Sequence, residues 1–147
     1  MNYQTEPITM WSDRRLVMRQ SSIQGIGTFA TQDIQAGEML ILVTGGIVLT
    51  PEDRRSGRLQ LAAEMYNEES LGEDLSIVTP KLFHYYINHS CDANAVDLSR
   101  SANSTQYVAA RQIRADEEIT ADYYDQTTLE VCECKSPRCR WLGPAQR

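Results

Sequence analysis

Four cysteines form the clearest chemical pattern in the sequence. Cys132, Cys134 and Cys139 lie close together near the C-terminus, separated by one and four residues, whereas Cys91 lies in the middle of the chain. This clustering fits a disulfide framework badly, but it fits tetrahedral zinc, for which Cys91 is the only cysteine left to supply a fourth ligand. Such a zinc would be structural, because four sulfurs leave no open position for water. The alternative is four free or buried thiols.

A run of polar residues, Asn88-His89-Ser90, directly precedes Cys91 and follows the apolar, aromatic segment 81–87. Polar groups that a buried element delivers must find hydrogen-bond partners, so this run could bind a polar ligand. The alternative is that Asn88 and Ser90 only satisfy the backbone of their own turn.

Two further segments could take part in a site. Gly25-Ile26-Gly27 lets the backbone approach a ligand closely, although it lacks the third glycine of a dinucleotide fingerprint and could be a tight turn between strands. Segment 118–124, EITADYY, is predicted to be a strand whose end projects Asp and Tyr. A tyrosine hydroxyl is mostly protonated at neutral pH, so Tyr123 would orient a substrate amine rather than deprotonate it. The alternative is a pair of tyrosines packed in the core.

The elements that must position these residues are mostly short strands. Five glycines in the first half of the chain are predicted to mark turns between them, which favours a β-meander there. One helix is predicted from Pro51 to about Tyr66, and segment 81–88 is expected to be buried as a strand or a short helix. The predicted strands are Leu16–Met18, Met39–Val43, Ile47–Leu49, Tyr107–Ala109 and Ile119–Tyr123, and the glycines are Gly25, Gly27, Gly37, Gly45 and Gly46.

Two fragments of the chain resemble each other, QDIQAGEML at 32–40 and RQIRADEEI at 111–119. Each has an isoleucine, a short polar turn and an acidic residue that leads into a predicted strand. Two copies are too few for a repeat architecture. They predict two similar turns that feed two strands.

Composition and charge restrict the function. A chain of 147 residues suits one domain, and a net charge of −6 argues against direct nucleic-acid binding and for a basic peptide partner. The longest apolar stretch, 39–43, is too short to span a membrane, and the N-terminus lacks a secretory apolar core, so we expect a soluble, intracellular protein with no membrane partner. Acidic residues between 59 and 80 form either a wall for a basic peptide or a solvated helix face; they are Glu64, Glu68, Glu69, Glu73 and Asp74.

The four motifs, taken in order from the Gly-x-Gly segment through Asn88–Cys91 and 118–123 to the cysteine loop, resemble a SET domain followed by a post-SET zinc loop. The resemblance runs from about Arg14 to Gly143. It implies a SET domain over residues 14–125 and a post-SET loop over residues 130–146. It also implies a mainly β (α+β) fold of small curled sheets, with a pseudoknot in which the C-terminal strand passes under the loop after Asn88.

The resemblance also implies a function, that of a protein-lysine methyltransferase that uses S-adenosylmethionine and is held together by zinc. The target lysine enters a narrow channel from the face opposite the donor, and its neutral amine attacks the methyl group in line. The expected partner is a basic protein or peptide such as a histone-like tail, and the chain is expected to be a monomer or homodimer. The rival interpretation is a SET-like module that binds a peptide or donor without turnover. The implied site residues are the catalytic Tyr123, the donor-binding Gly25, Ile26, Gly27, Asn88, His89 and Trp141, and the zinc ligands Cys91, Cys132, Cys134 and Cys139.

The sequence departs from the family pattern in the channel and in one turn. Val43 stands where the family has a channel tyrosine, and Tyr86 or Tyr124 is a candidate replacement. Ala121 stands where the family uses Phe or Tyr to limit methylation, which predicts a product that is not limited to monomethyl-lysine. Asp116 occupies a position that is usually a turn glycine.

Overall fold

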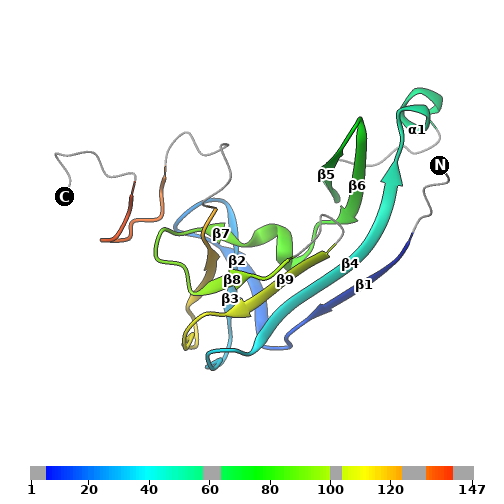
Figure 1. Ribbon diagram of the computed structural model, residues 1–147. Coiled ribbons are helices and arrows are strands. Elements are labelled where there is room, and N and C mark those ends of the chain that lie inside the picture. Colours follow the sequence, from blue (N-terminus) through cyan, green and yellow to red (C-terminus); the bar gives the residue numbers. More distant parts are fainter. Residues whose placement is uncertain (1–5, 58–63, 100–103, 124–131, 141–147) are drawn as a thin grey trace.

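The computed structural model describes residues 6–57, 64–99, 104–123 and 132–140, and Figure 1 shows a mostly β molecule whose strands curl around one another. The predicted mainly β character is confirmed. None of the helices in the described ranges is long and apolar enough to cross a membrane. The elements are β1 Glu6–Ser12, β2 Leu16–Gln20, β3 Ile26–Ala30, β4 Met39–Leu49, α1 Pro51–Ser56, β5 Tyr66–Gly72, β6 Leu75–Pro80, the 3₁₀ helix η1 Phe83–Tyr86, β7 Asn88–His89, β8 Ala95–Asp97, β9 Ser104–Ala109 and β10 Glu118–Ala121.

The strand β10 joins distant parts of the chain. The strand order is β2-β3-β10-β8-β9-β4-β6-β5, with β1 beside β4 and β7 beside β10. β10 runs antiparallel to β3 and parallel to β7 and β8. Within its four residues, Ile119 pairs with Thr28 and Thr120 pairs with Asn88. This short strand therefore brings the Gly-x-Gly segment and the Asn-His segment to the same place.

The two similar turns predicted from the sequence are present and lie against each other. Ile34 and Ile113 are fully buried and exchange two backbone hydrogen bonds of 2.8 and 2.9 Å. Gly37 and Asp116 occupy the same left-handed position, with φ of 86° and 66°, a conformation that Asp tolerates better than most residues. One turn leads into β4 and the other into β10, so the prediction of two turns feeding two strands is confirmed.

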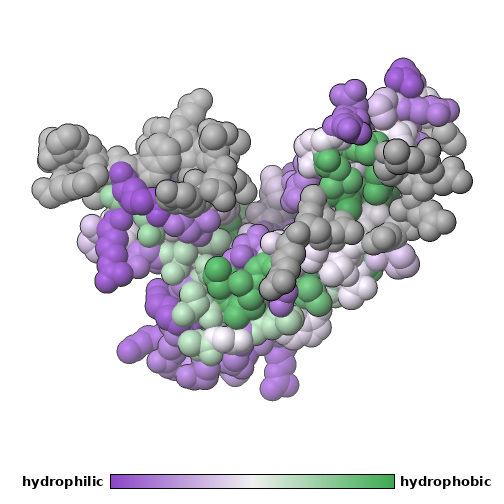
Figure 2. Space-filling model, in the orientation of Figure 1, coloured by the Kyte–Doolittle hydropathy of each residue, from purple (hydrophilic) through white to green (hydrophobic). Residues whose placement is uncertain are grey.

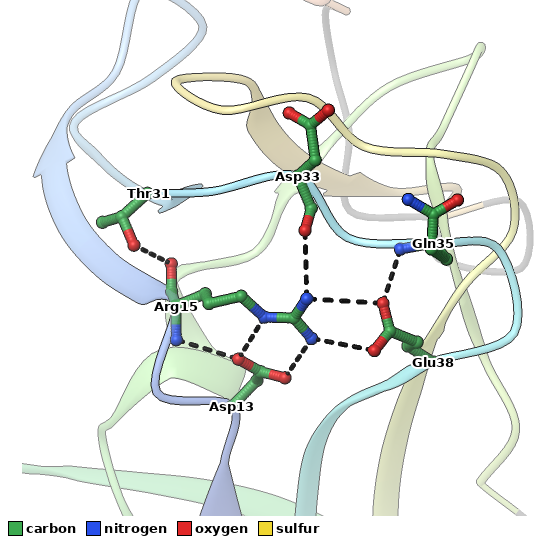
Figure 3. Close-up of polar contacts among 6 residues, drawn as sticks. All are labelled: Asp13, Arg15, Thr31, Asp33, Gln35 and Glu38. Atoms are coloured by element: carbon green, nitrogen blue, oxygen red, sulfur yellow. Dashed lines mark hydrogen bonds and ion pairs between the residues drawn. The ribbon is translucent and has the colours of Figure 1, made fainter.

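A partly exposed arginine cluster fastens the first of these turns (Figure 3). The guanidinium of Arg15 donates to Asp13 at 2.7 and 2.9 Å, to the Asp33 carbonyl at 3.0 Å and to Glu38 at 3.0 Å. Hydrogen bonds from Arg15 lower the pKa of both the Asp13 and the Glu38 carboxyl groups. The cluster therefore holds residues 31–38 against the turn between β1 and β2.

The predicted turns at Gly27, Gly45 and Gly46 are wrong. Gly27 lies inside β3, and the other two lie inside β4, an uninterrupted strand of 11 residues that replaces two predicted strands. β4 pairs with β9 up to Thr44 and with β6 from Ile47, so the glycines mark a change of partner. A Cβ on Gly46 would lie 2.5 Å from the side chain of Ile77, so glycine permits the close approach of β6.

The predicted helix begins where expected but is too long. Thr50 caps α1 and Pro51 opens it, in a capping box with Asp53. The helix ends at Gly57, which has φ of 63°, and Tyr66 belongs to β5 instead. Residues 58–63 lie outside the described ranges.

The acidic segment is a hairpin, so its interpretation as a helix face is wrong. Glu68 and Glu69 lie on β5, and Asp74 lies in the turn to β6. Glu68 forms an ion pair with Arg54 of α1 at 2.5 Å. Figure 2 shows the end of the molecule that carries α1 and this hairpin projecting from the rest, with hydrophilic side chains at its outermost point.

Segment 81–88 contains the short helix η1 rather than a continuous strand, and it is only partly buried. Leu82 and Tyr85 are 41% and 43% exposed, contrary to the expected burial, because one side of the turn faces solvent. His84 and Ile87 point inward. His84 is 8% exposed, and within the described ranges neither of its ring nitrogens has a hydrogen-bond partner.

The stability of the protein is expected to fall on mild acidification because of His84. Burial lowers the pKa of this imidazole, whereas the unfolded chain titrates near its ordinary value of about 6.5. The unfolded state therefore takes up more protons as the pH falls from 7.5 to 5.5, and the free energy of unfolding decreases. His84→Leu should lose less stability over this range and should be as stable at pH 7.5, or up to about 1 kcal/mol more stable, because it removes an unpaired buried polar group. Urea denaturation at the two pH values checks this; an equally steep loss in the variant would contradict it.

Candidate functional site

Asn88 connects the Gly-x-Gly segment to β10. Its side-chain amide donates to the carbonyl oxygens of Gln24 at 3.0 Å and Ile26 at 3.3 Å and to the Glu118 carboxylate at 2.7 Å. The alternative that Asn88 satisfies only its own turn is therefore wrong, since its partners lie on other segments. For Ser90 that alternative holds, because its hydroxyl accepts from the Asp92 N–H at 3.1 Å.

The two glycines of the Gly-x-Gly segment serve different purposes. Gly25 has φ of 48°, and a Cβ there would meet no atom within 4 Å, so the backbone faces open space that a ligand could enter. A Cβ on Gly27 would lie 2.2 Å from the Glu118 carboxylate, so glycine is required by the packing inside the site. Ile26, between them, is 44% exposed. The geometry fits a donor cradle in this segment, and the donor contacts themselves stay predictions.

Tyr123 lies just beyond the end of β10, at the boundary of the core. Its hydroxyl donates to the Ile87 carbonyl oxygen, and its backbone N–H donates to the Nδ1 atom of His89 at 3.0 Å. Burial raises the pKa of the Tyr123 hydroxyl, so it remains a hydrogen-bond donor at neutral pH. Both features suit a group that orients a substrate. Tyr124 lies outside the described residues, so the alternative of a packed tyrosine pair stays open.

His89 lies between Tyr123 and the cysteines. It is buried, and this burial lowers the pKa of its imidazole. Because Nδ1 accepts from Tyr123, the neutral ring carries its hydrogen on Nε2, which lies 3.4 Å from the Cys91 sulfur. The ring therefore supports both the tyrosine backbone and the cysteine cluster.

The four cysteines meet, as expected from the sequence. Their sulfur atoms all lie within 4.8 Å of one another, and the Cys91 sulfur lies 3.9 Å from those of Cys132 and Cys139. Tetrahedral zinc with bonds of about 2.3 Å holds its sulfurs about 3.8 Å apart. The donor set and its spacing therefore fit a structural zinc ion.

Three cations of the cysteine loop fasten it to the rest of the protein. Lys135 donates to the Ser22 carbonyl oxygen at 2.7 Å, Arg138 pairs with Asp92 at 3.3 Å, and Arg140 binds Asp122 through two hydrogen bonds of 2.7 Å. The last pair joins the neighbour of Cys139 to the neighbour of Tyr123. A cavity of about 350 Å³ lies where the loop meets the β2–β3 turn, and it is lined by Ser22, Ile23, Cys132, Glu133, Lys135 and Cys139.

The expected channel residues are only partly accounted for. Val43 is buried, at 4% exposed, and borders a small cavity of about 90 Å³ together with Trp11 and Phe83. Ala121 of β10 is 3% exposed, and it pairs with His89 of β7 and with Ala95 of β8. The role of Tyr86 as a replacement aromatic stays a prediction. Trp141 lies outside the described residues.

The sequence alone predicts no partner for three residues of this site: Glu118, Asp122 and Arg140. Each acts through a partner that is distant in sequence, such as the Ser21 hydroxyl, which donates to Glu118 at 2.8 Å. In the sequence, Glu118 and Asp122 belong to segment 118–124 and Arg140 follows Cys139, but no local pattern identifies their partners.

Comparisons with known proteins agree with this geometry. A family model described as the SET domain matches residues 25–124. The histone-lysine N-methyltransferase ATX2 of Arabidopsis thaliana is 31% identical over 138 residues, which cover 86% of this chain and 13% of the plant protein. Histone-lysine N-methyltransferase 2B of Homo sapiens is 28% identical over 137 residues, covering 82% of this chain and 5% of the human protein. The chain thus spans a small fraction of these relatives.

A solved structure has a similar fold. The crystal structure of a Plasmodium falciparum protein described as a candidate histone methyltransferase superposes with a TM-score of 0.54 and covers 78% of this chain and 97% of that one. Its sequence is 20% identical, so the likeness concerns the fold.

Proposed function

The chain belongs to the SET-domain family, and from that premise we propose that it transfers a methyl group from S-adenosylmethionine to the ε-amine of a lysine in a basic protein. The observation that carries the proposal is the convergence of Tyr123, Asn88 and the open side of Gly25 around β10. The proposed domains are the SET domain at 14–125 and the post-SET zinc loop at 130–146.

Donor binding is assigned to Gly25, Ile26, Gly27, Asn88 and His89, with Trp141 as a cover. When bound, S-adenosylmethionine would supply a methyl group made electrophilic by its sulfonium. The exposed backbone at Gly25 leaves space for a ligand, and the hydrogen bonds of Asn88 keep this backbone and β10 in register. Cys91, Cys132, Cys134 and Cys139 would hold one zinc ion, which fixes the loop beside the donor site.

The role assigned to Tyr123 is to orient the acceptor amine. Its hydroxyl is held by the Ile87 carbonyl and stays protonated, since burial raises its pKa. The lysine must first lose its proton, which at pH 7 costs about 4.6 kcal/mol for an amine with a pKa near 10.4. A buried channel favours the neutral amine and offsets part of this cost. Alignment of the amine with the methyl group then supplies most of the acceleration.

The net charge of −6 supports a basic acceptor. A histone-like tail is the acceptor class we propose, because relatives carry the name histone-lysine N-methyltransferase. Because histone-like proteins occur inside the cell, the proposed place of action is intracellular. On the β5–β6 hairpin, Glu69 and Asp74 are exposed, whereas Glu68 is already paired with Arg54.

Incubating the chain with labelled donor and a library of basic peptides tests the proposal. Label should appear on lysine, and peptides in which lysine is replaced by arginine should stay unlabelled. The rival function, a SET-like module without turnover, predicts tight binding of donor or peptide with no transfer.

The product is expected to carry more than one methyl group. Ala121 is a small, buried residue of β10, so its side chain takes up less room beside the acceptor amine than a Phe or Tyr would. Ala121→Phe should shift the product towards monomethyl-lysine and lower the yield of higher states by about tenfold. Mass spectra of the acceptor peptide over time check this, with a thermal melt confirming that the variant is folded. A wild-type reaction that stops at one methyl group would contradict the prediction.

A further inference from the structure

The amide group of Asn88 faces more acceptors than it has hydrogens. Its nitrogen carries two hydrogens and lies within hydrogen-bond distance of three oxygen atoms: two backbone carbonyls of the Gly-x-Gly segment and one oxygen of Glu118. The contact with Glu118, at 2.7 Å, is the shortest of the three. The reverse orientation of the amide would place its oxygen against three other oxygens and is strongly disfavoured.

Glu118 is itself held firmly. Its second carboxylate oxygen accepts from the Ser21 hydroxyl at 2.8 Å. Its first oxygen fills the space where Gly27 lacks a side chain. The Glu118 carboxylate therefore contacts three segments around the proposed donor site. They are the turn at Ser21, Gly27 of β3 and Asn88 of β7.

We propose that Glu118 is a positioning residue that fixes the amide of Asn88, so that the amide oxygen is presented to the donor. This rests on the proposed function, because it assigns Asn88 to donor binding. Within the described ranges the Asn88 amide oxygen has no hydrogen-bond donor of its own, which leaves it to accept from a ligand such as the amino groups of S-adenosylmethionine. Glu118 acts through the position of its oxygens and not through its charge.

Two substitutions separate position from charge. Glu118→Ala removes the acceptor and should weaken binding of S-adenosylhomocysteine, measured by calorimetry, by about tenfold. The KM for the donor should rise similarly, while kcat at saturating donor should change by less than about threefold. Glu118→Gln keeps an oxygen for Asn88 and can donate to Ser21, so it should restore most of the affinity. A Glu118→Gln variant as weak as Glu118→Ala would show that charge acts instead and would overturn the inference.

Gly27→Ala provides an independent test through a double-mutant cycle. In the native protein the new methyl group must displace the Glu118 carboxylate, so affinity should fall by about tenfold or more. In the Glu118→Ala background the nearest remaining atom is the Asn88 amide nitrogen, at 3.2 Å, so the same change should cost less than about threefold. Equal costs in both backgrounds would contradict the proposed role of Glu118.

Glu117→Ala is the matched control. Glu117 precedes Glu118 and binds Arg111 at 2.6 Å and Asn94 at 3.0 Å. Its removal takes away one carboxylate directly before β10 and should lower stability while leaving donor affinity within about twofold. If the native chain binds the donor and Glu118→Ala binds it equally well, the inference about Glu118 fails but the proposed function does not. If the native chain binds no donor and transfers no methyl group, the proposed function fails.

Discussion

Tyr123→Phe is expected to lower kcat for methyl transfer by about two to three orders of magnitude, in the range typical of losing a positioned hydroxyl from a reaction centre. The ring keeps its place beside His89, with centroids 5.3 Å apart, and only the hydroxyl bound to the Ile87 carbonyl is removed. One such hydrogen bond contributes about 1 kcal/mol to stability. The variant should therefore fold and bind donor nearly as well as the native chain.

Tyr107→Phe is the control for that prediction. Tyr107 is also a buried tyrosine, 9% exposed, and burial raises its pKa, but it lies on β9 and is not part of the proposed centre. Rates are measured from the mass of the acceptor peptide, and donor affinity from calorimetry. The assignment of Tyr123 fails if its variant keeps more than half of the native rate, or if both variants lose activity equally.

Cys139→Ser is expected to reduce bound zinc from about one per chain to nearly none and to weaken donor binding by at least tenfold. The other three cysteines remain, but a hydroxyl is a poor zinc ligand and the tetrahedral set is broken. The β core should stay folded, because its buried side chains come mainly from the strands and turns up to Ala121. Loss of the metal therefore acts on the loop, which borders the cavity beside Ser22 and Ile23 next to the proposed donor-binding segment.

Metal analysis, calorimetry and hydrogen exchange check this prediction together. Exchange should increase in residues 132–140 and stay nearly unchanged in β3, β4 and β10. Arg138→Ala is a suitable control, since it removes an exposed side chain next to Cys139 and one ion pair of 3.3 Å with Asp92, a contact worth at most about 1 kcal/mol. A metal-free native protein with full activity would rule out the structural zinc.

Much of the site could be predicted because its motifs are local. The cysteine spacing predicted the cluster, and the expected SET-type fold is confirmed by the family match and by the structural comparison. The parallel pairing of β10 with β7 could not be predicted from periodicity, since residues about 30 positions apart leave no local signal. The same reason explains why Glu118 and the Arg140–Asp122 pair were missed.

The errors in the fold have a common physical origin in glycine. Gly45 and Gly46 suggested a turn, but they allow β4 to change partners, and Gly57 ends a helix that was predicted to continue. Glycine permits both backbone conformations with positive φ and the close approach of a neighbouring segment. Which of the two a given glycine serves depends on its neighbours in the folded protein, such as Ile77, which contacts Gly46 only once the sheet has formed.

The mass of a lysine-bearing basic peptide after incubation with the chain and S-adenosylmethionine tests the account most directly. We predict added methyl groups with the native chain and almost none with Tyr123→Phe. An unchanged peptide mass, under conditions in which the native chain binds the donor and holds zinc, would contradict the proposal of a methyltransferase centred on Tyr123.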